Sequence, residues 1–299
     1  MISFAVEHWN LMADFECNKR VSKMISEELK EKPIYIFYDN NTIFYKDIVN
    51  ALKKSEIEKG DTIFVHVNLG AFGKLGTIID RSDFANLYIE AFLEVIGQDG
   101  TIVTPTYTYS FCDGEIYDPD TTPSKVGLFS DEFRKRLDSY RSVNPIFSVS
   151  AIGKKAKNLT TNLSKSCFGK GSIFDKLQEM DNSKYVVVGV DYFICSQVHY
   201  IEQCMNVPYR YVKNFYGIIK IKDKTYEDVC EFYVRHLDWD VNTDFDKIEQ
   251  HLVDKELMKK IPLGQDFIST VKIRNICDEG AAMLKKDPNY FLTKPPVLK

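Results

Sequence analysis

The chain has 299 residues, of which 44% are hydrophobic and 27% are charged, and its formal net charge is −4. This is the balance of a globular protein with one large or two modest domains. Lys and Arg are spread along the chain without the basic stripe that marks a nucleic-acid partner, so the composition argues against nucleic-acid binding.

Cysteine usage and the N-terminus predict a cytoplasmic protein. The seven Cys are an odd number and none stand in a C-x2-C spacing, which argues against a disulfide scaffold and against a Cys-rich metal site. Residues 1–20 lack an uninterrupted apolar stretch after a basic start, so no signal peptide is expected. No run approaches the roughly 20 apolar residues of a membrane span, so no membrane insertion is expected.

Hydrophobic periodicity in the first part of the chain predicts alternating helices and strands. Apolar residues three and four apart indicate helices, and β-branched runs indicate buried strands. The expected helices are 16–32, 44–54 and 82–96, and the expected strands are 34–38, 62–67 and 101–109. The last of these carries Pro105, so the strand must end or become exposed there.

The second part begins with a long polar connection over 110–127, which we expect to be an active-site loop because long connections in compact domains are usually functional. Residues 216–234 predict a strand, a turn, and then a strand or a helix. The other expected elements are helices 129–137, 244–260 and 270–286 and strands 146–152 and 184–190. The alternation predicts a parallel-leaning α/β sheet in one domain, 1–299, with an N-terminal arm (1–32) and a C-terminal elaboration (210–299).

Two glycine-containing strings could bind a ligand. NLGAFG (68–73) follows the strand 62–67 but matches neither G-x-G-x-x-G nor a P-loop, so a plain turn and a ligand loop both stay open. His66 lies at the carboxyl end of that strand, where α/β sheets bind ligands, although a lone histidine there is more often a hydrogen-bonded core residue. GKGS (169–172) has the wrong spacing for a phosphate loop and predicts a turn that opens a helix.

His199 and Glu202 stand three residues apart after the apolar strand 184–190. Ser196 is a plausible N-cap, which would place both side chains on one face of the first helical turns. A neutral His oriented by a carboxylate can accept a proton from a nucleophile. The absence of H-E-x-x-H argues against zinc. From the spacing alone, a catalytic pair and a structural pair both remain open.

Seven short motifs follow one another over residues 60–202. They are GDTIFVHVNLGAFG (60–73), TIVTPTYT (101–108), DPDTTPSKVG (118–127), DEFRKR (131–136), RSVNPIFSVSAIG (141–153), FGKGSIFDKL (168–177) and His199-x-x-Glu202 after an apolar strand. In this order they resemble the aminoglycoside 3-N-acetyltransferase family. The resemblance implies a three-layer α/β/α sandwich, distinct from the small acetyltransferase fold.

The resemblance also implies an activity, which is transfer of an acetyl or other short acyl group from coenzyme A to the amine of an amino sugar. His199 would be the general base, and Glu202 would orient and charge its imidazole. The acyl group would pass directly to the amine without a covalent acyl-enzyme. Backbone N–H groups of the loop 66–73 would bind the developing oxyanion.

By the same resemblance, the loop 66–73 and the strand end 104–107 would hold the pantetheine arm and the thioester. The expected coenzyme-binding residues are His66, Asn68, Leu69, Gly70, Phe72, Gly73, Thr104, Thr106, Asn144 and Ser148. The expected acceptor-binding residues are Tyr107, Asp118, Thr122, Ser124 and Asp191.

Departures from the family pattern bear on the acceptor. The family's H-S-S-L is H-V-N-L here, and the 110–127 loop carries only Asp113, Glu115, Asp118 and Asp120. A polycationic aminoglycoside requires many carboxylates, whereas abundant aromatic residues and Lys suit a nucleotide-linked (dTDP or UDP) amino sugar for surface polysaccharide. We favour the nucleotide-linked acceptor. The alternatives are antibiotic resistance and a non-catalytic nucleotide- or sugar-binding relative, and a homodimer stays open.

Overall fold

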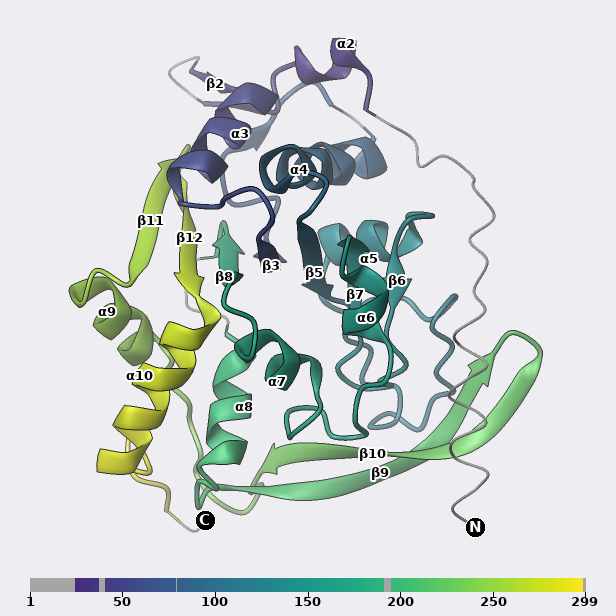
Figure 1. Cartoon of the computed structure of the whole chain (residues 1–299), viewed down its shortest axis with the longest axis vertical. Coiled ribbons are helices and arrows are strands. Elements are labelled where there is room, and N and C mark those ends of the chain that lie inside the picture. Colours follow the sequence, from purple (N-terminus) through teal and green to yellow (C-terminus); the bar gives the residue numbers. More distant parts are fainter. Residues whose placement is uncertain (1–24, 38–40, 79, 191–194, 298–299) are drawn as a thin grey trace.

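The structure is a computed structural model that describes residues 25–37, 41–78, 80–190 and 195–297. Its centre is a seven-stranded mixed sheet, whose strands can be followed side by side in Figure 1. In spatial order the strands are β11 (Met258–Leu263), β12 (Asp266–Lys272), β8 (Ser183–Val188), β3 (Thr62–Val67), β5 (Thr101–Pro105), β7 (Val149–Gly153) and β6 (Tyr140–Arg141).

The predicted parallel-leaning sheet is correct only at its centre. β3 pairs in parallel with β8 and with β5, whereas β12, β11, β7 and β6 are added antiparallel. A tight hairpin forces β11 and β12 to be antiparallel, because β11 ends at Leu263 and β12 begins at Asp266, whereas the antiparallel pairs β12–β8 and β5–β7 join strands far apart in the chain.

Helices cover both faces of the sheet and build two separate cores. Along β3, Ile63 and Val65 belong to one core and Phe64 to the other, as the alternation of a strand requires. The first core is covered by α3 (Tyr45–Lys54), α4 (Arg81–Ile96) and α5 (Leu128–Lys135). The second is covered by α6 (Ala156–Thr160), α7 (Ile173–Gln178), α8 (Gln197–Cys204) and α10 (Ile273–Lys286). The expected three-layer α/β/α sandwich is confirmed.

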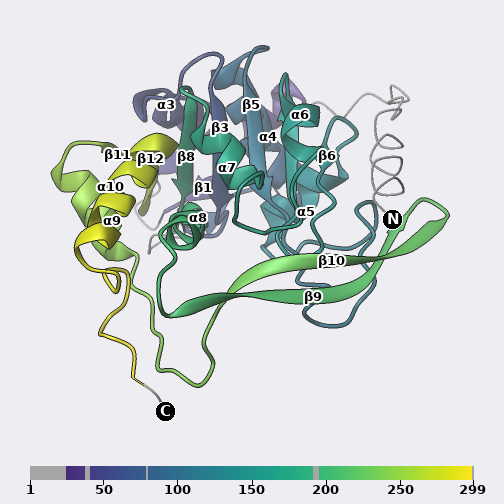
Figure 2. The same ribbon diagram turned by 60° about the horizontal axis from the view of Figure 1, so that its bottom comes forward.

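A long β-hairpin lies outside the main sheet. It consists of β9 (Arg210–Ile221) and β10 (Lys224–Arg235), so the second segment is a strand and not a helix. Figures 1 and 2 show the hairpin extending from the end of α8. It is attached to the body by Tyr117 N–H, which donates to Ile218 C=O at 2.9 Å, and by Cys167 N–H, which donates to Glu231 C=O at 2.8 Å.

The remaining elements correct several predicted boundaries. A small sheet contains β2 (Thr42–Ile43), β1 (Tyr35–Ile36) and β4 (Lys74–Leu75). The predicted helix 16–32 is α2 (Glu27–Lys30) within the described residues, and positions 16–24 lie outside them. The predicted helix 244–260 is α9 (Asp246–Asp254), which ends before Glu256 because that residue has a left-handed φ of 59°. The predicted helix 270–286 is α10 (Ile273–Lys286), because residues 270–272 are the last three residues of β12.

Three further findings hold for the residues that the structure describes. Among their helices, none has the length and apolar character to cross a membrane. No three His, Cys, Asp or Glu side chains there come together as a metal site. The six described cysteines, namely Cys112, Cys167, Cys195, Cys204, Cys230 and Cys277, are free thiols.

Candidate active site

The start of α8 is held by two tyrosines. Ser196 precedes the helix, but its side chain does not cap it, which corrects the predicted N-cap. The Ser196 hydroxyl instead accepts a hydrogen bond from Tyr107 Oη at 2.8 Å, and the Ser196 N–H donates to Tyr185 Oη at 2.9 Å. Both tyrosines are buried, so the first turn of α8 is anchored to the core of the protein.

His199 and Glu202 are in direct contact on this helix. His199 Nδ1 lies 2.7 Å from Glu202 Oε2. The Glu202 side chain is 0% exposed, whereas that of His199 is 21% exposed. Because the buried carboxylate engages Nδ1, Nε2 is the ring nitrogen left to receive a proton from a substrate.

Two residues that the sequence analysis missed complete the contacts of Glu202. Tyr209 Oη donates a hydrogen bond to Glu202 Oε1 at 2.8 Å. Arg210 Nε lies 2.8 Å from Glu202 Oε2, and its side chain is 8% exposed. A buried carboxylate requires a compensating charge, and Arg210 is the first Lys or Arg after Glu202 in the chain, so this signal was present in the sequence.

Aromatic rings pack against the imidazole from two other segments. The Phe168 ring lies 5.0 Å from the His199 ring and the Phe245 ring lies 5.5 Å from it, both edge-on. Phe168 is fully buried, and Phe245 is half-buried in the segment before α9. The rings restrict the imidazole's orientation and remove water from its surroundings.

These surroundings shift both ionisable groups of the pair. Burial lowers the pKa of His199 below its ordinary value, the charge of Arg210 lowers it further, and the bond to Glu202 opposes both. Burial raises the pKa of Glu202, but the His199 bond, the Arg210 charge and the Tyr209 bond outweigh it, so the net shift is downward. Both shifts favour a neutral imidazole beside an ionised carboxylate. Glu202 raises the pKa of His199, the direction that the sequence analysis expected, but burial and Arg210, which that analysis did not include, outweigh it.

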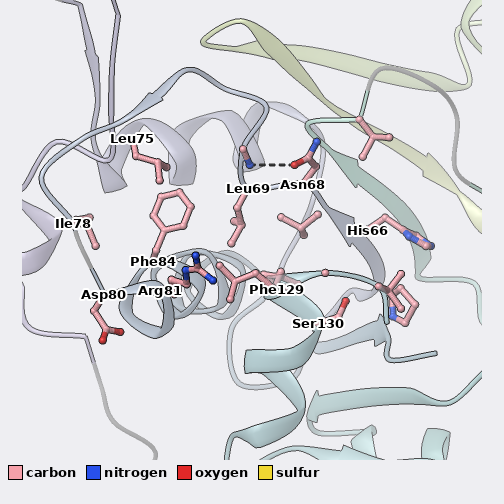
Figure 3. Close-up of a pocket in the computed structure, with 17 residues that line it drawn as sticks. His66, Asn68, Leu69, Leu75, Ile78, Asp80, Arg81, Phe84, Phe129 and Ser130 are labelled. Atoms are coloured by element: carbon pink, nitrogen blue, oxygen red, sulfur yellow. Dashed lines mark hydrogen bonds between the residues drawn. The ribbon is translucent and has the colours of Figure 1, made fainter. Parts of the chain in front are cut away.

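A pocket of about 480 Å³ opens where the chain leaves β3. The loop after β3 lines one side of it, while α4 and α5 line the other (Figure 3). Its lining residues are His66, Val67, Asn68, Leu69, Gly70, Leu75, Ile78, Asp80, Arg81, Phe84, Pro105, Val126, Gly127, Leu128, Phe129, Ser130 and Val190. The volume and the largely apolar lining suit a small organic ligand.

The α5 side of the pocket is suited to an anion. Four consecutive residues at the start of α5, 127–130, line the pocket, and no side chain caps this helix. Free N–H groups and the helix dipole favour negative charge at such a position. The exposed Arg81 stands on the same side of the pocket, as Figure 3 shows.

His66 connects the pocket to α8. It is 5% exposed, and its ring stacks on Tyr185 at 5.6 Å. Tyr185 in turn bonds the backbone of Ser196, so one ring separates the pocket residue from the start of the helix that carries His199. Burial lowers the pKa of His66 to about 3, so this histidine is neutral and is not a second base at physiological pH.

Four of the ten predicted coenzyme residues line the pocket: His66, Asn68, Leu69 and Gly70. The other six lie elsewhere, because their side chains or backbone are used inside the fold. Phe72 packs on the rings of Tyr35 and Tyr88, and Gly73 lies against Phe37. The Thr104 hydroxyl donates a hydrogen bond to Val65 C=O, and the Ser148 hydroxyl donates one to Thr106 C=O. Asn144 Oδ1 accepts from the N–H groups of residues 146 and 147.

The predicted oxyanion donors are also partly engaged already. Asn68 N–H donates to Val188 C=O at 2.9 Å, and Ala71 N–H donates to Asn68 C=O at 3.3 Å. Gly70 N–H donates to Asn68 Oδ1 at 3.1 Å, the bond drawn in Figure 3. These three N–H groups stabilise the loop and are not free to bind a thioester oxygen.

The predicted acceptor residues do not line this pocket. Tyr107 bonds Ser196, and Asp118 N–H donates to Thr122 Oγ1 at 2.9 Å. Ser124 Oγ accepts from Val126 N–H at 3.2 Å. The side chains of the 110–127 loop are thus largely engaged within the loop or with the core, and Asp191 lies outside the described residues.

Comparisons with known proteins find similarity over most of the chain. A family model described as aminoglycoside 3-N-acetyltransferase matches residues 64–285. Aminoglycoside N(3)-acetyltransferase IV from Salmonella sp is 26% identical over 257 residues, covering 80% of this chain and 92% of the relative. The matched residues include the loop after β3 and the His199–Glu202 pair.

Solved structures share the fold. AAC-IIIb in a binary complex with CoASH has a TM-score of 0.69 at 19% identity, covering 84% of this chain and 98% of that one. AAC-VIa bound to sisomicin has a TM-score of 0.70 at 17% identity, covering 81% of this chain and 97% of that one.

Proposed function

Because this chain belongs to the aminoglycoside 3-N-acetyltransferase family, we propose that it transfers acetyl from acetyl-CoA to a primary amine of an amino sugar, with His199 as the general base. The protein is an N-acyltransferase that takes its acyl group from coenzyme A. The single observation that carries the His199 role is the contact of its Nδ1 with the buried Glu202 carboxylate, which leaves Nε2 for the substrate.

The reaction follows from the state of the imidazole. The amine nitrogen attacks the thioester carbon while its proton moves to His199 Nε2, so a C–N bond forms and the C–S bond then breaks. The leaving coenzyme A thiolate takes up a proton, which returns His199 to its neutral form. A neutral imidazole can begin this cycle near neutral pH because it does not have to lose a proton first.

The coenzyme would lie in the pocket between the loop after β3 and the starts of α4 and α5. Its phosphates would lie near Arg81 and the uncapped N-terminus of α5, and its pantetheine arm along Leu69 and Pro105. The fold neighbour with CoASH bound supports a coenzyme site in this fold. Acetyl-CoA is available in the cytoplasm, which is where we place the enzyme.

The acceptor is a small amino sugar, and two classes of it have support. The half-buried ring of Phe245 beside His199 suits a nucleotide-linked amino sugar, in line with the sequence. The second class, aminoglycosides, is favoured by Asp244 and Asp246 on either side of Phe245, because carboxylates bind polycations. AAC-VIa bound to sisomicin supports this class also.

A thiol-release assay with acetyl-CoA separates the two acceptor classes. The panel contains dTDP- and UDP-linked amino sugars together with kanamycin and gentamicin. Turnover on nucleotide sugars alone would assign the enzyme to surface-polysaccharide synthesis, and turnover on antibiotics alone would assign it to resistance. If no thiol is released with acetyl-CoA or with longer acyl-CoA donors, the proposed activity is contradicted and a binding protein is favoured.

His199→Ala tests the general base directly. We expect turnover to fall by about 10²–10⁴-fold, the usual contribution of a general base. The matched control is His251→Ala, because His251 Nε2 also contacts a carboxylate, Glu279 Oε2, at 2.7 Å but lies on α9. The control should keep its turnover, and an active His199→Ala variant would rule out the assigned base.

A further inference from the structure

We propose that Arg210 is a positioning residue for the catalytic base: its guanidinium compensates the charge of Glu202, so that the carboxylate orients His199 without drawing a proton onto it. The inference rests on the proposed role of His199. It assigns to the β9–β10 hairpin a part in the chemistry, because Arg210 is the first residue of β9.

The three groups meet at one oxygen atom. Glu202 Oε2 lies 2.7 Å from His199 Nδ1 and 2.8 Å from Arg210 Nε. The Glu202 and Arg210 side chains are 0% and 8% exposed, so water screens this contact weakly. The cation therefore acts on the carboxylate at close to its full strength.

Charge balance then sets the protonation state of the imidazole. With Arg210 present, the carboxylate and the guanidinium sum to zero, and a protonated His199 would add an uncompensated positive charge to a buried cluster. Without Arg210, His199 would be the nearest cation available to the carboxylate, and an ion pair of His199 and Glu202 would form. With Arg210 present, Glu202 can therefore orient the His199 imidazole without causing it to become protonated.

The other groups that face His199 do not replace this charge. Phe168 and Phe245 present uncharged rings. Tyr209 donates a neutral hydrogen bond to Glu202 Oε1. Among the described residues, the charged groups that act on the imidazole are Glu202 from α8 and Arg210 from β9.

Arg210 contributes charge more than hydrogen-bond geometry. Its Nε is close to Oε2, but the N–H is not directed so as to make a hydrogen bond with any described residue. Its Nη1 donates to Tyr233 C=O at 3.4 Å, which holds the side chain along the hairpin. A lysine at this position should therefore preserve the effect on His199, and a methionine of similar length should abolish it.

The test is a nuclear magnetic resonance titration of the histidine side chains in the full chain. The signal of His199 is assigned by its loss in His199→Gln. We expect Arg210→Met to raise the pKa of His199 by about 1 unit or more relative to wild type, and Arg210→Lys to titrate like wild type. Arg235→Met is the matched control, because Arg235 is paired with Arg210 across the hairpin but is exposed.

The kinetic counterpart is the acid limb of kcat, measured with one acceptor for all variants so that ionisation of the acceptor cancels. The limb should move to higher pH in Arg210→Met by the same amount as the titration. If Arg210→Met does not fold, Glu202→Gln is compared with Glu202→Gln/Arg210→Met. The pKa of His199 should be higher in the double variant, because only that variant lacks the guanidinium charge, and equal pKa values would overturn the role of Arg210.

Failure of the inference can be told apart from failure of the proposed function. If His199 in Arg210→Met has the same pKa as in wild type, the role assigned to Arg210 is overturned, whatever happens to turnover. Equal shifts in Arg235→Met would overturn it also, because they would come from the hairpin in general. Retained turnover in His199→Ala would instead overturn the proposed base while leaving the titration result in place.

Discussion

Individual side chains of the pocket and of α8 owe their charge state to burial. His66 is the clearest case, because it is 5% exposed and its Nε2 has no hydrogen-bond partner among the described residues. Its imidazole instead stacks on the ring of Tyr185 and lies tilted against that of Phe64. A polar ring in such surroundings stays neutral, because protonation would place a charge where no described carboxylate compensates it.

This burial predicts a loss of stability in acid. The folded-state pKa of His66 is lowered from 6.5 to about 3, so below pH 6.5 the unfolded chain takes up a proton that the folded chain does not. The free energy of unfolding should therefore fall with decreasing pH by about 1.4 kcal/mol per pH unit for this group alone. In His66→Phe the free energy of unfolding, measured with urea, should fall between pH 6.5 and pH 4 by that much less per pH unit than in wild type. Above pH 7.5, as a control, the two proteins should show the same dependence of the free energy of unfolding on pH. An unchanged slope in the variant would show that His66 is not held neutral.

Elements from distant parts of the chain hold the aromatic ring beside His199. The segment before α9 lies along the C-terminal tail, with Asp244 N–H donating to Phe291 C=O at 2.8 Å and Thr293 N–H donating to Asn242 C=O at 2.9 Å. The Phe291 ring is fully buried and contacts the Phe245 ring at 6.0 Å. The tail thus determines where Phe245 meets the imidazole.

Phe245→Ala tests this arrangement. We expect kcat to fall by up to about 100-fold, because a small misplacement of a catalytic group is costly. The acid limb should also move to higher pH, since removal of the ring lets water reach His199 and weakens the burial that lowers its pKa. The control is Tyr290→Ala, which removes the ring on the other side of Phe291, 5.6 Å away, without contacting His199. Equal losses in the two variants would indicate a general effect of the tail.

At the scale of the whole molecule, the site combines elements from the two sides of the central sheet. The pocket belongs to the loop after β3 and to α4 and α5, and the base belongs to α8, the hairpin and the segment before α9. Coenzyme binding should therefore stabilise the folded molecule as a whole.

Acetyl-CoA at about 100 times its Kd should raise the free energy of unfolding by about 2.7 kcal/mol, by linkage. Thermal or urea unfolding with and without the coenzyme measures this. In Arg81→Glu the same coenzyme concentration should stabilise less, because the reversed charge repels the phosphates at the exposed side of the pocket. Lys46→Glu, an exposed charge reversal on α3, is the control. Equal stabilisation in both variants would place the phosphates elsewhere.

The features of this protein that follow from its sequence are those that depend on residues close together in the chain. Periodicity and ordered motifs determined the α/β class, the family, the central strands and the pairing of His199 with Glu202, because residues three apart on a helix meet whatever the rest of the chain does. The same reasoning placed Asn68 and His66 at a pocket, because loops at the carboxyl ends of parallel strands meet there.

Only the tertiary structure decided the antiparallel outer strands, the buried roles of Thr104, Thr106 and Ser148, and the arrival of Arg210 and Phe245 at the imidazole. Strand order and long-range packing join segments that no local pattern links, and the protonation state of His199 depends on that packing. The sequence by itself therefore determined which residue is the candidate base, and the fold determined the burial and the Arg210 charge that lower the pKa of its imidazole.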